Sequence, residues 1–333
     1  MNKFKEFDGI RGIAILSIVA CHICYGMDSM SSLGQYLGGT FNIVFFILSS
    51  LLIGLSIDAR RTLVNGRLCE KMFLRKRLLR LGPDLWLFLT LFLLIASIFD
   101  IACTFKQIII NYLMLGWFAK LPYCGHLWFV TMILFCYILF AVSLNVKNKV
   151  LFLTKLLVVC IVGQIIFTMI HFPAYMFLIL FLSGISMLYS TDILYMIDRI
   201  NIWIIFIVTV LLNACFYYLI NRHFFVIGNL DYYYMAGISG LTMIVGLYKL
   251  FKKIRVPKFL IYISTLSYQI YLVHHPLCNT NYITNLVGSK FLAIVLIFIV
   301  SICCAYILNF LGIFLMSEIY FICSKIKILK KRL

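Results

Sequence analysis

The chain has 333 residues, of which 64% are hydrophobic and only 12% are charged, and its mean hydropathy is +1.07. Soluble globular domains contain about 45–50% apolar and about 25% charged residues. A water-soluble domain of this length needs a polar shell, and 11 acidic with 29 basic residues cannot form one. The composition therefore excludes soluble enzymes, secreted scaffolds and disordered chains, and it indicates an integral membrane protein.

The formal net charge of +18 does not indicate a nucleic-acid-binding protein, because the basic residues lie between the apolar segments and not on one aromatic-bearing surface. The 12 cysteines are scattered through apolar segments without the paired spacing of a disulfide framework. Cys21 and Cys24 bracket His22, but no second pair of ligands accompanies them. We therefore expect no metal site.

Ten apolar segments are each long enough to cross a bilayer as a helix, and longer than the strands of a membrane barrel. They cover residues 10–27, 37–57, 84–100, 125–144, 150–169, 173–190, 202–220, 234–251, 259–277 and 290–317. The first segment is not followed by a cleavage pattern, so we expect it to stay as the first span. The sequence thus predicts an all-α polytopic bundle of about ten transmembrane helices.

Lysine and arginine accumulate in short cytoplasmic loops, so their distribution tests the number of spans. With ten spans and both termini in the cytoplasm, 25 of the 29 basic residues lie on the cytoplasmic side. If the shorter apolar segment 105–118 also crossed, the basic stretch from Lys249 to Lys258 would lie outside. We therefore expect residues 101–124 to form an extracytoplasmic interfacial or re-entrant segment within a single domain of residues 1–333.

The first span carries two ionisable side chains on one helical face. It begins Phe-Asp-Gly-Ile-Arg-Gly at residues 7–12, and His22 lies inside its apolar run. Arg11 and His22 are eleven residues apart, or just over three turns, so they project from one face about 16 Å apart along the axis. Alone, Arg11 is explained as a topology anchor and His22 as a partner of a neighbouring helix; the pair on one face favours a functional role. Asp8 could cap this helix or pair with Arg11.

The segment 58–84 is rich in arginine, including Arg75, Arg77 and Arg80. The last two are spaced i, i+3, so we expect them to lie together on a short helix that ends before Pro83. Guanidinium pairs of this kind suit phosphate groups, which they bind in a bidentate manner. Attraction to lipid head groups explains the same charge equally well.

Two clusters lie near the predicted outer face. Gly-His-Leu-Trp-Phe at residues 125–129 opens the fourth span, and its aromatic part is typical of an interfacial belt. The second cluster closes the ninth span with the double histidine His274 and His275. Ser267, Tyr271 and His274 are spaced to lie on one helical face.

The last span holds a single acidic residue, Glu318, near its predicted cytoplasmic end. This carboxylate could pair with an arginine of the basic segment 58–84, or it could mark a solvated helix end. The sequence does not decide between the two.

The order and spacing of these motifs resemble those of the acyltransferase-3 membrane family over nearly the whole chain. The matching motifs are Phe7 to Gly12 with His22, Arg77-x-x-Arg80-x-x-Pro83, Leu127-Trp128-Phe129, and Ser267-Tyr268 through Tyr271-Leu272-x-His274. One departure is that many relatives carry a glutamate a few residues after the tryptophan, where this chain has Met132, Ile133 and Leu134.

The resemblance implies a ten-span enzyme that transfers an acyl group, usually acetyl, from cytoplasmic acyl-CoA to a hydroxyl of an extracytoplasmic glycan. The short chain is similar to the O-antigen O-acetyltransferases of serotype-converting bacteriophages, which implies the bacterial inner membrane and modification of lipopolysaccharide. It implies no permanently bound cofactor, with acetyl-CoA as the donor substrate. The expected partners are the lipid bilayer, acyl-CoA and a cell-surface polysaccharide, and no nucleic acid.

The resemblance gives the candidate residues their expected roles. His22 meets the thioester as a base or as an acyl carrier, two roles that the sequence leaves open. His274 receives the acyl group or positions the acceptor. The expected catalytic residues are His22, Arg11 and His274, and the expected substrate-binding residues are Arg75, Arg77, Arg80, Trp128, Tyr271, Ser267, Asp8 and Glu318.

A transporter of a glycan or of a proton-coupled solute is the alternative. Transporters usually interrupt spans with glycine or proline near the midplane and place acidic residues there. Here the five prolines lie at predicted span ends, and most acidic residues lie outside the spans. This favours an enzyme.

Overall fold

The computed structural model describes residues 4–25, 30–64, 68–170, 175–225, 229–279 and 282–330, and all regular elements in these ranges are helices. Eight of the described helices are long and apolar enough to cross a membrane, which confirms a polytopic helical bundle. They are α1 (Lys5–Tyr25), α2 (Ser31–Val64), α3 (Glu70–Ile98), α5 (Trp128–Ser143) with the preceding turn η2 (Gly125–Leu127), α6 (Lys149–Met169), α9 (Ile202–Asn221), α10 (Leu230–Lys253) and α14 (Lys290–Lys330).

Two of the ten predicted spans differ from single long helices. The sixth, residues 173–190, corresponds to the short helix α7 (Tyr175–Leu188). The helix α8 (Ser190–Arg199) follows at a bend of 81°, and the pair supplies a ninth candidate span. The segment 259–277 is divided between α11 (Lys258–Thr265) and α12 (Ser267–Asn279). Here Thr265 Oγ1 donates to the carbonyl of Tyr262, so a side chain competes with the helical hydrogen bonds. The described residues thus hold eight or nine spans in place of ten, and the cytoplasmic position of both termini stays a prediction.

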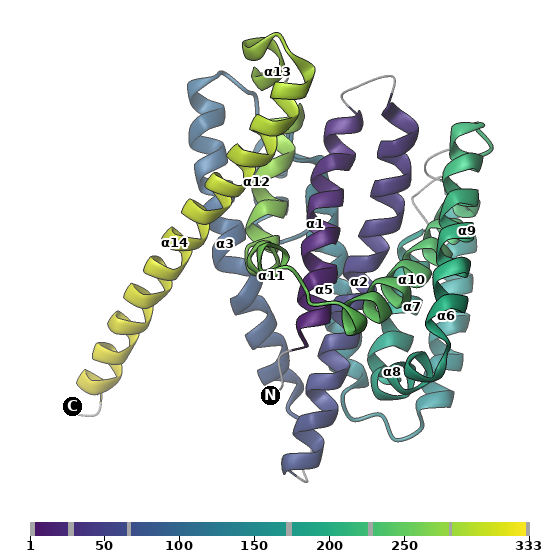
Figure 1. Cartoon of the computed structure of the whole chain (residues 1–333). Helices are drawn as coiled ribbons and strands as arrows, with labels where there is room; N and C mark the ends of the chain where they lie inside the picture. The colour runs from purple at the N-terminus through teal and green to yellow at the C-terminus, as the bar shows by residue number, and fades with distance from the viewer. Residues whose placement is uncertain are drawn as a thin grey trace. The chain divides into compact units, whose positions relative to one another are not determined.

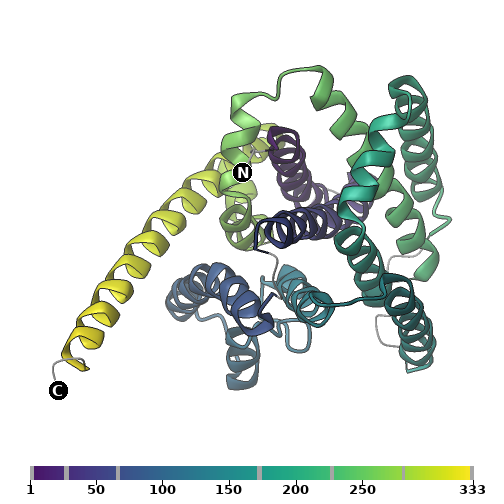
Figure 2. The ribbon, with the colours of Figure 1, turned by 90° about the horizontal axis from the view of Figure 1, so that it is seen from below.

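The chain forms two compact units, which we call the first unit (residues 1–74 and 132–267) and the second unit (residues 75–131 and 268–333). In the first unit α1 and α2 lie side by side, as Figures 1 and 2 show, and α10 packs on α2 and α9. The second unit includes α4 (Phe105–Tyr112), α12, α13 (Tyr282–Val287) and the long helix α14, which contacts α13 (Figure 1). The single-domain organisation stays a prediction.

Glycines bring α1 close to its neighbours at both of its ends. A Cβ atom on Gly12 would collide with the backbone carbonyl of Leu260 in α11. On α2, a Cβ on Gly34 would lie 3.0 Å from the carbonyl oxygen of Cys21, and one on Gly38 would lie 2.7 Å from its Sγ. Small residues four apart allow helix backbones to approach closely in a membrane. The start of α1 is therefore fixed by α11 and its end by α2.

Helix α3 continues through Pro83, so the expectation of a short helix that ends before this proline is wrong. Proline removes one helical hydrogen bond. Its Cδ also clashes with the Cβ of the residue before it. That residue is Gly82, which has no Cβ, and the ring of Trp86 packs against its Cα. The hydroxyl of Tyr268 in α12 donates to the carbonyl of Leu81 at 3.0 Å, which adds support at this point.

Residues 101–124 fold as a short helix and a following turn structure. Helix α4 begins with a capping box, in which Thr104 and Gln107 each bond the other's backbone. The amide of Asn111 donates to the carbonyl of Ala119 at 2.7 Å, and Trp86 Nε1 of α3 donates to the carbonyl of Tyr112 at 2.9 Å. The segment is therefore ordered against α3, and its place relative to the membrane stays a prediction.

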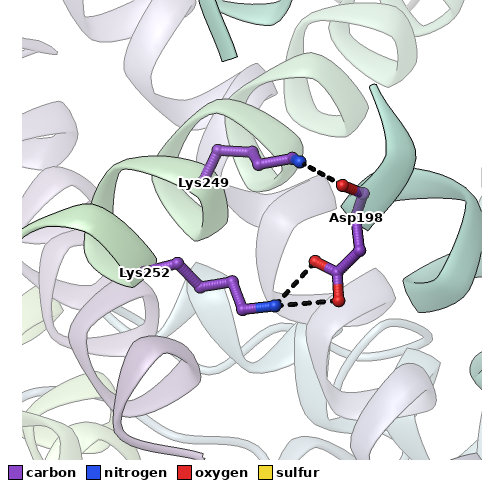
Figure 3. Close-up of polar contacts among 3 residues, drawn as sticks. All are labelled: Asp198, Lys249 and Lys252. Atoms are coloured by element: carbon purple, nitrogen blue, oxygen red, sulfur yellow. Dashed lines mark hydrogen bonds and ion pairs between the residues drawn. The ribbon is translucent and has the colours of Figure 1, made fainter. Parts of the chain in front are cut away.

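Helix α8 is attached to α10 by a cluster of charged side chains (Figure 3). Lys252 Nζ lies 2.8 Å from both carboxylate oxygens of Asp198, and Lys249 Nζ donates to the backbone carbonyl of Asp198 at 2.8 Å. One acidic residue near the end of α8 thus joins two lysines that are one helical turn apart.

Candidate functional site

The start of α1 holds an ion pair. Helix α1 begins at Lys5, so Asp8 lies within its first turn, and the interpretation of Asp8 as the cap is wrong. Arg11 Nη1 lies 3.7 Å from Asp8 Oδ1, which in turn accepts a 3.5 Å hydrogen bond from Ser264 of α11. The Arg11 side chain is 20% exposed, so its guanidinium is oriented by Asp8 and still reachable.

His22 lies in the same unbroken helix, eleven residues after Arg11. Its side chain is half-buried, and its ring centroid lies 6.3 Å from that of Tyr25. Cys21 and Cys24 on either side are buried, with Cys21 against the glycines of α2. The tight contact with α2 therefore fixes the helix turn that carries the imidazole.

The arginines of the basic segment lie together on α3, in the second unit. Arg75 and Arg80 are exposed and Arg77 is half-buried. The i, i+3 pair of Arg77 and Arg80 is thus part of one continuous helix, as the spacing predicts. Arg11 belongs to the first unit, and joint action of these arginines on one ligand stays a prediction.

Three histidines meet in the second unit. His126, His274 and His275 are 2%, 0% and 7% exposed, respectively. The ring of His126 stacks on that of His275, with centroids 4.6 Å apart and planes at 19°, and lies 5.4 Å from that of His274. The sequence singled out His274 and missed the contact with His126. The sequence feature that could have indicated this contact is that both histidine-bearing motifs lie at predicted outer ends of spans.

Backbone carbonyls assign the protonated ring nitrogen of these histidines. A carbonyl oxygen only accepts, so a ring nitrogen bonded to it carries the hydrogen. His126 Nε2 lies 3.1 Å from the carbonyl oxygen of Leu272, and His274 Nδ1 lies 3.1 and 2.8 Å from those of Ile270 and Tyr271. The lone pair of neutral His274 is therefore on Nε2, which is the nitrogen suited to accept a proton.

Three further residues predicted to bind substrate are Ser267, Tyr271 and Trp128. Ser267 and Tyr271 are buried in α12, and the Tyr271 hydroxyl donates to the backbone carbonyl of His126. Trp128 is half-buried and meets Trp117 edge to face, with centroids 5.4 Å apart. The Tyr271 hydroxyl thus joins α12 to the backbone at His126.

A half-buried carboxylate that the sequence did not single out lies between three helices of the second unit. Gln269 Nε2 of α12 donates to Asp84 Oδ2 of α3 at 2.7 Å and lies 3.3 Å from Asn309 Oδ1 of α14. The other carboxylate oxygen of Asp84 lies directly over Gly312. Glu318, by contrast, is exposed on α14.

Among the described residues, no group of three or more histidine, cysteine, aspartate or glutamate side chains has the geometry to hold a metal ion. The arrangement offers imidazoles for proton or acyl transfer and guanidinium groups for an anionic ligand.

The model of the acyltransferase-3 family, described as an acyltransferase domain, matches residues 4–310. No curated protein and no solved structure matches the chain.

Proposed function

We propose, from the premise that this chain belongs to the acyltransferase-3 family, that it is an O-acetyltransferase of the bacterial inner membrane. In this proposal the acetyl group of cytoplasmic acetyl-CoA passes to a sugar hydroxyl of an extracytoplasmic polysaccharide such as O-antigen. Membership of the family and the membrane-crossing helices make the chain a multi-pass membrane acyltransferase. The donor, the acceptor and the likeness to phage serotype-converting enzymes are our proposal.

The observation that carries the proposal is the continuity of α1 between Arg11 and His22. Coenzyme A is polyanionic and cannot enter lipid, but its extended pantetheine arm is compatible with a path along a helix. Arg11, oriented by Asp8, is placed to hold an anionic group at the predicted cytoplasmic end. His22 is the titratable group three turns further along the same face.

The chemistry then needs one proton acceptor. The sugar hydroxyl oxygen attacks the thioester carbonyl carbon, its proton passes to an imidazole nitrogen, and the C–S bond breaks. The coenzyme A thiolate takes up the proton, so the products are the acetyl ester and free coenzyme A. In the alternative route the imidazole itself is acetylated and then passes the acetyl group to the hydroxyl.

Purified protein in nanodiscs, supplied with radiolabelled acetyl-CoA and O-antigen polysaccharide, tests the proposal. Wild type should label the polysaccharide and His22→Asn should not. His223→Asn is the matched control, because His223 is an exposed histidine in the turn after α9 whose positive φ asparagine tolerates. No labelling by wild type would overturn the function, and normal labelling by His22→Asn would remove His22 from the mechanism.

A rapid quench without acceptor separates the two routes. Radiolabel that stays on wild-type protein and is absent from His22→Asn identifies His22 as the acetyl carrier. If no label stays on the wild-type protein in this quench, although wild type labels polysaccharide when the acceptor is present, His22 acts as the base.

A further inference from the structure

Tyrosines from three helices meet at the predicted outer end of the first unit. Tyr25 ends α1, Tyr175 begins α7, and Tyr232 and Tyr233 lie in the first turn of α10. We call these four residues the tyrosine platform. Helix α10 packs on both α1 and α7, so the platform is formed by neighbouring elements of one unit.

Three of the four platform rings contact one another. Tyr175 stacks on Tyr233 with centroids 3.8 Å apart and planes at 17°, and Tyr233 meets Tyr232 edge to face at 5.0 Å. Tyr232 is buried, and its hydroxyl donates to the carbonyl of Gln35 at 2.6 Å. Tyr25 lies at the end of α1, which packs on α10. Tyr232 thus anchors the group to α2, while the other three rings are half-buried or exposed.

These contacts distinguish the platform from an ordinary interfacial belt. Belt tyrosines place single rings among the lipid head groups. The ring of Tyr218 on α9, which is 54% exposed, is an example of a single exposed ring. The platform rings come from α1, α7 and α10, and those of Tyr175, Tyr232 and Tyr233 contact one another. They form a rigid aromatic surface with phenolic hydroxyls, which act both as donors and as acceptors.

The platform lies beside the candidate reactive histidine. Tyr25 follows His22 by one helical turn, and their ring centroids are 6.3 Å apart. Close by, the hydroxyl of Tyr234 donates to the side-chain carbonyl of Gln164 at 2.9 Å. A ligand on the aromatic surface would therefore have hydroxyl and amide partners around it and an imidazole at its edge.

A pyranose ring matches this surface chemically. Its C–H face is apolar and packs on aromatic rings, while its hydroxyls need donors and acceptors at the rim. We propose that Tyr25, Tyr175 and Tyr233 form the subsite for a pyranose ring of the acceptor glycan, and that they present one of its hydroxyls to His22. This inference rests on the proposed function, because it assumes a glycan acceptor.

Saturation-transfer NMR tests the subsite without requiring turnover. The probes are methyl glucopyranoside, methyl galactopyranoside and methyl rhamnopyranoside, added to the full chain in nanodiscs without acetyl-CoA. Wild type should transfer saturation to the ring C–H protons of at least one probe. Tyr233→Leu should reduce this signal about fivefold or more, and Tyr233→Phe should keep it because the stacking ring remains.

Tyr218→Leu is the matched control and should bind as wild type does, because its exposed ring lies outside the platform. Tyr25→Leu supplies a second variant at a partly exposed helix end, should Tyr233→Leu fail to fold. In turnover assays the platform variants should raise the KM for polysaccharide about tenfold, equivalent to about 1.4 kcal/mol, and leave the KM for acetyl-CoA unchanged.

The outcomes separate this inference from the proposed function. Equal signals from wild type and the two leucine variants, or no signal from any probe, would overturn the subsite even if acetyl transfer occurs. Absence of acetyl transfer by wild type would overturn the proposed function whatever the NMR result.

Discussion

The backbone carbonyl of Tyr123 accepts a hydrogen bond from Nδ1 of His275 at 2.7 Å, and Tyr123 holds this position in a left-handed conformation with φ of 55°. Such a conformation is costly for residues other than glycine and asparagine, and it persists only where the surrounding structure imposes it. Here it directs the carbonyl at the end of the 101–124 segment toward the histidine cluster.

This geometry predicts opposite results for two substitutions of Tyr123. Tyr123→Gly should fold with little loss, because glycine adopts positive φ and the tyrosine ring is 40% exposed. Tyr123→Val should lower the free energy of unfolding by about 1–3 kcal/mol, because β-branched residues resist this conformation. Tryptophan fluorescence during thermal unfolding in detergent measures the difference. Equal melting temperatures for the two variants would contradict the role of the backbone.

The contact of α1 with α11 predicts that Gly12 cannot be enlarged. A Cβ on Gly12 meets the backbone of Leu260, which has no side-chain freedom to yield, so Gly12→Ala should cost about 1–3 kcal/mol. It should also impair activity, since Arg11 is the adjacent residue. Thermal unfolding and acetyl-transfer assays measure the two effects.

Gly237 of α10 provides the control for Gly12. A Cβ there would lie 3.6 Å from the nearest atom, a side-chain carbon of Leu182, which is an ordinary packing distance. Gly237→Ala should therefore be neutral, or slightly stabilising because alanine favours the helix. A larger loss from Gly237→Ala than from Gly12→Ala would be inconsistent with the packing described.

Most of the fold could be predicted because hydropathy measures the length of chain that lipid can cover. The positions at which the observed helices differ from the predicted spans have another cause. At Leu266 the predicted span 259–277 is interrupted, and the helix ends there for a local reason, the hydroxyl of Thr265. Hydropathy averages over such a position, so it predicted a continuous span there. At Pro83 the error was the reverse, because the preceding glycine relieves the usual clash.

In the candidate site, too, some residues could be placed from the sequence and others could not. Arg11 and His22 could be placed on one face because helix geometry fixes it. The stack of His126 on His275 depends on how residues 101–124 fold, and the bond from Gln269 to Asp84 depends on how three helices meet. No local pattern reports such long-range contacts.

The cluster in Figure 3 predicts a small, salt-sensitive coupling. Asp198 and Lys252 side chains are 42% and 43% exposed, so water screens their attraction. A double-mutant cycle with Asp198→Ala and Lys252→Ala should give a coupling energy below about 1 kcal/mol, and less at high ionic strength. Thermal unfolding at two salt concentrations measures it. A coupling well above this limit would mean that the pair is shielded from solvent in the membrane.

The arginines of α3 predict a selective effect on the donor substrate. If Arg77 and Arg80 bind the phosphates of acetyl-CoA, Arg77→Gln and Arg80→Gln should each raise the KM for acetyl-CoA at least about tenfold, since a charge-assisted hydrogen bond contributes about 1.5–3 kcal/mol. Lysine at these positions should restore only part of the affinity, because it lacks the bidentate geometry.

The control for this last prediction is Lys71→Gln. Lys71 is exposed on the same helix, nine residues before Arg80 and therefore on its opposite face. If the basic residues act only through their charge at the membrane surface, all three variants should shift the KM alike, and raised salt should weaken wild type and variants equally. A KM that rises for Arg77→Gln and Arg80→Gln but not for Lys71→Gln would instead identify a phosphate site, because only a fixed pair of guanidinium groups distinguishes one helix face from the other.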